Sequence, residues 1–99
     1  MTTLLIIILI MLTAFPVQAQ FAGGSGTVED PYQVETLEHL QEIADTIYLY
    51  KHFIQVADID ASDTEAWNEG RGFEPIGSTS HPFTGTYDGK GHTITSLTI

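Results

Sequence analysis

Apolar and polar residues alternate along much of the chain after residue 28. Phe83, Gly85 and Tyr87 occupy alternate positions, and residues 92–99 resume a composition rich in Thr, Ile and Leu. A two-residue period is typical of β-strands. The glycine-rich segment 88–91 allows the sharp turn that would join these two strands. Further short strands are predicted at 32–34, 53–57 and 73–77, the last limited to an edge position or a strand start by its proline.

One segment has the three- and four-residue apolar spacing of an amphipathic helix. Its apolar face runs from Leu37 to Ile47, which predicts a helix over that range. Thr36 is a suitable N-cap, and Glu38 lies in the first turn, where the helix dipole favours an acid. His39 falls among the acidic residues and is expected to face solvent. We expect this helix to cover an edge of the β structure.

The first 28 residues have a different composition. Residues 4–12 are uninterrupted apolar residues, too few to span a membrane but suited to the core of a signal peptide. Val17 and Ala19 place small residues at positions −3 and −1 of a cleavage site before Gln20, although no Lys or Arg precedes the apolar run. We therefore predict a signal peptide at 1–19, a flexible segment at 20–28 and one domain at 29–99.

Charge and cysteine content narrow the range of functions. The chain has 13 acidic residues against three Lys and Arg, a formal net charge of −10, and no cysteine. Nucleic acids and anionic membranes are poor partners for such a chain. Disulfides and thiolate metal sites are excluded. The acidity suits solubility outside the cell, high salt or divalent cations.

A family resemblance is carried by residues 82–94, Pro-Phe-Thr-Gly-Thr-Tyr-Asp-Gly-Lys-Gly-His-Thr-Ile, followed by Leu-Thr-Ile at 97–99. Together with the order of the segments upstream, they resemble the first rung of secreted bacterial and archaeal β-helix proteins with GLUG-type repeats. The resemblance covers residues 23–99. It implies a mainly β fold with one N-terminal capping α-helix, the start of a right-handed parallel β-helix. We accordingly expect a fragment, truncated at its C-terminus, with later rungs of the same chain as partners.

The most chemically suggestive spot is Asp58-Ile59-Asp60. Asp58, Asp60, Ser62 and Glu69 have the spacing of positions 1, 3, 5 and 12 of a calcium loop. Position 6, which should be glycine, is Asp63, and a strand precedes the loop where the motif requires a helix. The alternative is that the carboxylates accept hydrogen bonds from turn amides. We favour this structural capping and expect no cofactor, with calcium as the remaining alternative.

Trp67 is the one tryptophan and falls in a polar loop, residues 63–72. Such a side chain can stack on a sugar, but packing onto a strand edge is its commoner role. His92 follows the glycine turn, as it does in the resembling repeats, where it looks structural.

No catalytic constellation is apparent in the sequence. Ser78, Ser80 and His81 are neighbours in one turn, whereas the members of a triad converge from separate elements. The three basic residues that could serve as a lyase base are Lys51, Arg71 and Lys90, each at a helix end or in a loop. We therefore assign no catalytic, cofactor or metal residues and do not expect an enzyme.

The expected function is that of the N-terminal segment of a secreted or cell-surface, adhesin-like β-helix protein with a structural or binding role. Surface glycans or other cell-surface proteins are candidate partners, and no membrane span is expected after signal cleavage. The alternative is the N-terminal part of a carbohydrate-active β-helix enzyme, similar to a polysaccharide lyase, whose catalytic rungs lie elsewhere.

Overall fold

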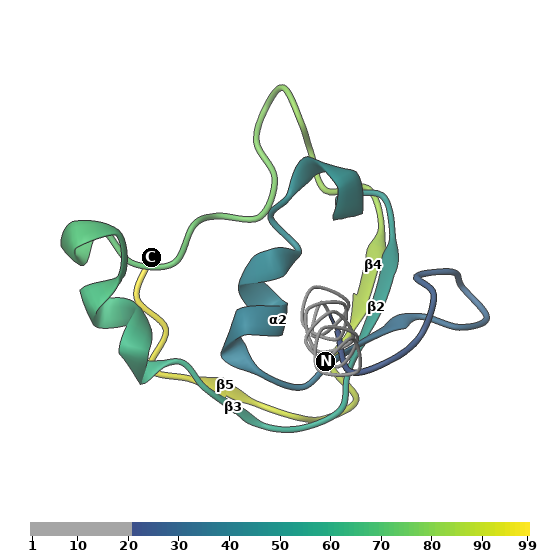
Figure 1. The fold of residues 1–99 in the computed structure, drawn as a ribbon, viewed down its shortest axis with the longest axis horizontal. Coiled ribbons are helices and arrows are strands. Elements are labelled where there is room, and N and C mark those ends of the chain that lie inside the picture. The colour runs from purple at the N-terminus through teal and green to yellow at the C-terminus, as the bar shows by residue number, and fades with distance from the viewer. Residues whose placement is uncertain (1–20) are drawn as a thin grey trace, which may run out of the picture.

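Short parallel strands wrap around one α-helix in the computed structural model of the protein, which describes residues 21–99 (Figure 1). The signal peptide expected at 1–19 and its cleavage site lie outside the described residues. In chain order the elements are β1 (Tyr32–Val34), α2 (Leu37–Glu42), a 3-10 helix (Thr46–Tyr48), β2 (His52–Gln55), β3 (Ile59–Asp60), a second 3-10 helix (Ser62–Gly70), β4 (Thr86–Asp88) and β5 (Ile94–Thr95).

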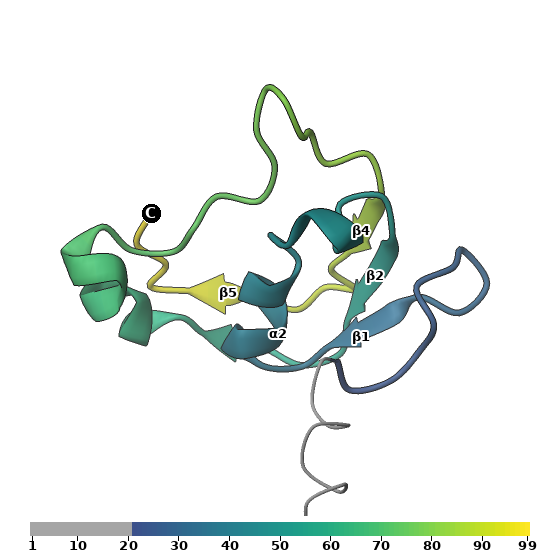
Figure 2. The ribbon, with the colours of Figure 1, turned by 45° about the horizontal axis from the view of Figure 1, so that its top comes forward.

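The strands form two small parallel sheets. The first has the order β1-β2-β4, and the second pairs β3 with β5. The register of the first sheet aligns Tyr32, Phe53 and Tyr87 in one row across its strands. Aromatic neighbours on adjacent strands stabilise such a sheet. The chain bends between β2 and β3, so the two sheets meet at an angle, and α2 lies within that angle (Figures 1 and 2).

The expected right-handed parallel β-helix is not what the structure shows, and this prediction was wrong. The strands are two to four residues long and form two separate small sheets within one small globular unit. The physical reason lies in the connections. Ser96, at φ 61°, ends β5 after two residues, and a 3-10 helix follows β3 directly. The motif residues favour parallel pairing between strands, but they do not specify the regular, repeated rungs of a β-helix.

The predicted helix is shorter than its apolar period. Thr36 caps it as expected, since its hydroxyl oxygen accepts the backbone amide of His39 at 3.1 Å. The α-helix ends after Glu42 rather than at Ile47, because Asp45 accepts the amide of Ile47 and begins a 3-10 turn. As a result Ile47 is 58% exposed and does not belong to the apolar face. No strand forms at 73–77, where Pro75 removes a backbone donor.

The core fills the angle between the two sheets and α2. Its members are apolar side chains from α2, from the strands and from the segment after the second 3-10 helix: Val34, Leu37, Leu40, Ile43, Phe53, Ile59, Ala61 and Phe73. Residues 21–23, in the segment expected to be flexible, lie along β1, where Gln33 exchanges backbone hydrogen bonds of 2.8–2.9 Å with Ala22 and Gly23. Phe21 then stacks on Tyr32, with ring centroids 4.6 Å apart. Burial of this apolar surface is the main stabilising term.

Candidate binding surfaces

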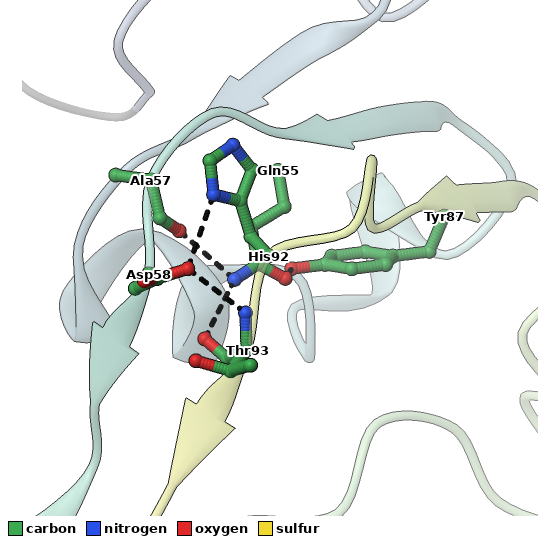
Figure 3. Close-up of polar contacts among 6 residues, drawn as sticks. All are labelled: Gln55, Ala57, Asp58, Tyr87, His92 and Thr93. Carbon is green, nitrogen blue, oxygen red and sulfur yellow. Dashed lines mark hydrogen bonds and ion pairs between the residues drawn. The ribbon is translucent and has the colours of Figure 1, made fainter.

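The carboxylate of Asp58 joins the starts of β3 and β5. Its Oδ1 accepts the backbone amide of Thr93 at 3.0 Å and lies 3.1 Å from Nδ1 of His92 (Figure 3). The Thr93 amide and then the His92 side chain hold the pKa of Asp58 below its usual value, because both stabilise the ionised form. His92 therefore occupies a structural position, as expected.

The carboxylate of Asp60, at the end of β3, also accepts a backbone amide. Its Oδ1 accepts the backbone amide of Ser62 at 2.9 Å, and this hydrogen bond lowers the pKa of Asp60. The prediction that these carboxylates bind turn amides is confirmed for Asp60, whereas Asp58 accepts the amide of a distant residue, Thr93. Glu69 lies at the opposite end of the second 3-10 helix. Within residues 21–99 no three Asp, Glu or His side chains lie close enough to hold a metal ion, so the calcium-loop spacing does not become a cluster in the fold.

A buried polar side chain stands at the corner between the two sheets, and the sequence analysis missed it. Gln55 is 2% exposed, and its Nε2 donates to the carbonyls of Ala57 at 2.9 Å and Thr93 at 3.0 Å (Figure 3). Its Oε1 accepts the hydroxyl of Tyr87 at 2.8 Å. The available signal was its position two residues after Phe53, on the buried face of β2. This network is fully satisfied and holds β2, β4 and the start of β5 together.

His39 is another departure from expectation. The side chain is buried rather than solvated, with 9% of its surface exposed. Its Nδ1 accepts the backbone amides of Glu35 at 3.1 Å and Thr36 at 3.3 Å, which completes the capping box begun by the Thr36 hydroxyl. A histidine at this third helical position can replace the usual Glu or Gln, and this was the signal that the sequence analysis overlooked.

The residues considered for catalysis make other contacts. The hydroxyl oxygen of Ser78 accepts the backbone amide of His81 at 3.1 Å, a turn contact that does not involve the imidazole. Nζ of Lys51 lies 5.0 Å from the ring centroid of Tyr50, and the exposed Arg71 and Lys90 lie in turns. The structure does not gather these side chains around one point.

Trp67 lines two surface hollows. One, of about 450 Å³, is lined by Gln41, Ala44, Asp45, Trp67, Asn68 and Glu74. The other, of about 510 Å³, is lined by Ser62, Asp63, Glu65, Ala66 and Trp67. The indole is half-buried and stacks on Phe73, with ring centroids 6.4 Å apart and planes at 16°. It therefore packs onto the core, as the commoner role requires, and it also lines an accessible surface.

An apolar groove lies beside β4 and β5. It encloses about 440 Å³, and its walls are almost entirely hydrophobic side chains: Leu40, Ile43, Phe73, Pro75, Ile76, Phe83, Tyr87, Ile94, Leu97 and Ile99. Ile94, Leu97 and Ile99 are exposed to 36%, 39% and 69%. The groove thus borders the outer strand of each sheet. Contiguous exposed apolar surface of this kind is typical of interaction sites.

None of the helices found in residues 21–99 is long and apolar enough to cross a membrane.

Comparison with known proteins finds two relatives over most of the chain. Halomucin of Haloquadratum walsbyi is 39% identical over 90 residues, covering 84% of this chain. A protein of Evansella cellulosilytica, named as a Gly-rich membrane protein, is 41% identical over 81 residues, covering 80% of this chain. The aligned region is 1% of halomucin and 9% of the second protein. No family model and no solved structure matches. The chain is thus similar to short regions of much longer proteins.

Proposed function

We propose that this chain is a structural and binding module of a secreted or cell-surface protein, and that its apolar groove docks a neighbouring segment of the same long polypeptide. The groove is the observation that carries this proposal. Exposed Ile94, Leu97 and Ile99 sit beside outer strands whose backbone can pair with an added strand. An occupant with alternating apolar side chains would cover the groove and extend one of the sheets.

The lengths of the relatives support an occupant from the same polypeptide. In both relatives the region similar to this chain is flanked by far more protein than it contains, since it makes up 1% and 9% of their lengths. A neighbouring segment of one polypeptide has a high effective concentration, so a small groove is enough to hold it.

The extracellular assignment rests on other observations. Residues 1–19 have the pattern of a signal peptide, and the net charge of −10 favours solubility. One relative is named as a membrane protein, which supports a location at the cell surface. A role in binding rather than catalysis is favoured by the two kinds of surface described above, an apolar groove and a tryptophan that lines two hollows.

Two measurements test the proposal. The full-length gene product, expressed in its source cells, should be accessible to protease added outside the cells and should begin at Gln20. A photo-crosslinking amino acid at Leu97 should then give crosslinks within the same polypeptide, whereas one at exposed Thr79 should not. A protease-protected intracellular product would overturn the location. Equal crosslinking from positions 97 and 79 would overturn the docking role of the groove.

A further inference from the structure

The backbone around Trp67 is held in an unusual conformation. Asn68 and Glu69, which follow it, have φ of 54° and 60°, the left-handed region that side chains other than glycine rarely adopt. Trp67 itself has ψ of 149°, so the 3-10 helix is kinked at this residue. Two consecutive left-handed residues cost conformational energy, and such outliers gather where a side chain must be presented in one orientation.

Contacts of the indole and of the backbone beside it stabilise this conformation. Phe73 stacks against it. The carbonyl of Trp67 accepts the amide of Gly72 at 2.9 Å, and Nδ2 of Asn68 donates to the carbonyl of Gly72 at 2.6 Å. The loop is thereby closed on itself immediately after the tryptophan. A preorganised aromatic surface loses little entropy when a ligand binds, which favours binding.

A second set of hydrogen bonds fixes two polar residues that line the first hollow. The side-chain amide of Gln41 exchanges two hydrogen bonds with the backbone of Glu74, at 2.8 Å and 3.1 Å. These hydrogen bonds link α2 to the segment after Gly72. Both Gln41 and Glu74 line the first hollow, and the side chain of Glu74 is exposed. Asp45 adds a second carboxylate to this hollow, and the second hollow carries Asp63 and Glu65.

We propose that Trp67 and the two hollows beside it bind a neutral glycan chain. A flat aromatic face packs against the apolar face of a sugar ring, while carboxylate and hydroxyl oxygens accept hydrogen bonds from sugar hydroxyls. A linear glycan laid across the indole would place successive rings in the two hollows. The many acidic side chains exclude phosphate-rich ligands by repulsion. The site is distinct from the apolar groove, so the inference does not depend on the proposed function.

Trp67 is the one tryptophan in the sequence, so its fluorescence reports on this site alone. We would titrate the full chain with cellohexaose and with the hexamer of N-acetylglucosamine. At least one should change the fluorescence saturably, with an affinity that stays within about twofold between about 0.05 and about 0.5 M NaCl, because the ligand is uncharged. If neither sugar changes the emission, the proposal fails. It also fails if decalysine binds in a salt-sensitive manner and neither sugar binds, because the site would then be one for cations.

Variants locate the binding, with affinity measured by calorimetry. Trp67→Ala should weaken binding about tenfold or more, while Tyr50→Ala, which removes a 59% exposed aromatic ring elsewhere, should leave it unchanged. Because Trp67 also contacts the core, a second variant is needed. Glu74→Ala removes an exposed side chain and should weaken binding about threefold to tenfold with an unchanged melting temperature, and Glu29→Ala is its control. Unchanged affinity in Glu74→Ala, or equal losses in Trp67→Ala and Tyr50→Ala, would overturn the proposal.

Discussion

The hydroxyl of Tyr87 donates a 2.8 Å hydrogen bond to Oε1 of the buried Gln55. Burial raises the pKa of Tyr87 to about 12, because the phenolate would lose its hydration there. The folded state therefore keeps a proton that the unfolded chain releases near pH 10. It follows that stability decreases as the pH rises above about 10.

Tyr87→Phe tests this contact. Removing the hydroxyl leaves Oε1 of Gln55 without its donor, and we expect a loss of about 1–3 kcal/mol at pH 7 in urea unfolding. The variant should also lose part of the decline in stability above pH 10. Tyr50→Phe, at an exposed ring, is the control, and its free energy of unfolding should match that of the wild type at pH 7 and above pH 10. A Tyr87→Phe variant as stable as the wild type would contradict the role assigned to this network.

The acid side of the pH profile depends on Asp58. Its pKa is lowered in the fold, so its contribution to stability is present above the unfolded value near 3.8 and is lost as the pH falls through the lower folded value. Asp58→Asn should be less stable than the wild type at pH 7, with the difference shrinking as the pH falls below the unfolded pKa near 3.8 and through the lower folded pKa. Asp63→Asn is the matched control at an exposed carboxylate. Thermal unfolding monitored by circular dichroism at a series of pH values would show whether the melting temperatures of Asp58→Asn and the wild type converge at low pH.

Thr36→Ala removes the side-chain cap of α2. The hydroxyl that accepts the His39 amide is lost, and the free energy of unfolding should fall by about 1 kcal/mol. Thr79→Ala, at an exposed turn residue, should stay within about 0.5 kcal/mol of the wild type. Chemical denaturation of both variants measures the difference. Equal effects would show that the capping box does not stabilise the helix.

Gly85 and Gly89 differ in the space around them. A methyl group on Gly85 would lie 1.7 Å from the carbonyl oxygen of Lys51, whereas none of the atoms described lies within 4 Å of one on Gly89. We expect Gly85→Ala to lower the stability by about 1–3 kcal/mol or more, because the backbone of residues 84–86 must move away from β2. Gly89→Ala should be close to neutral. A Gly85→Ala variant with an unchanged melting temperature would mean that these backbones approach less closely.

The features that could be predicted from the sequence are the local ones. Thr36 was identified as an N-cap because capping depends on residues three positions away. The Asp60 turn was predicted for the same reason, as its partner is two residues along the chain. The strand at 32–34 was located correctly, and so were the strands around Phe53 and Tyr87, although these two are shorter than their alternating patterns.

Features that depend on distant residues were missed. Two of the three partners of Gln55 are 32 and 38 positions away, so its burial could not be recognised from its neighbours. The β-helix prediction failed for a related reason. Motif residues 82–94 specify strands and a turn, but the length of each strand is decided by connections such as the left-handed Ser96. Two roles were considered for Trp67, packing onto a strand edge and stacking on a sugar. In the structure its indole packs on Phe73 of the core and also lines a surface hollow.

The corner at Gln55 also affects when folding can finish during synthesis. Its amide lacks its second carbonyl partner until Thr93, which precedes β5, has been made, and its oxygen lacks a donor until Tyr87 has been made. If β2 slipped by one residue, an apolar side chain would replace the amide at this corner and the buried polar groups would lose their partners. Pairing with β1 can align β2 early, but this corner is completed only by residues that the ribosome adds up to 38 positions later.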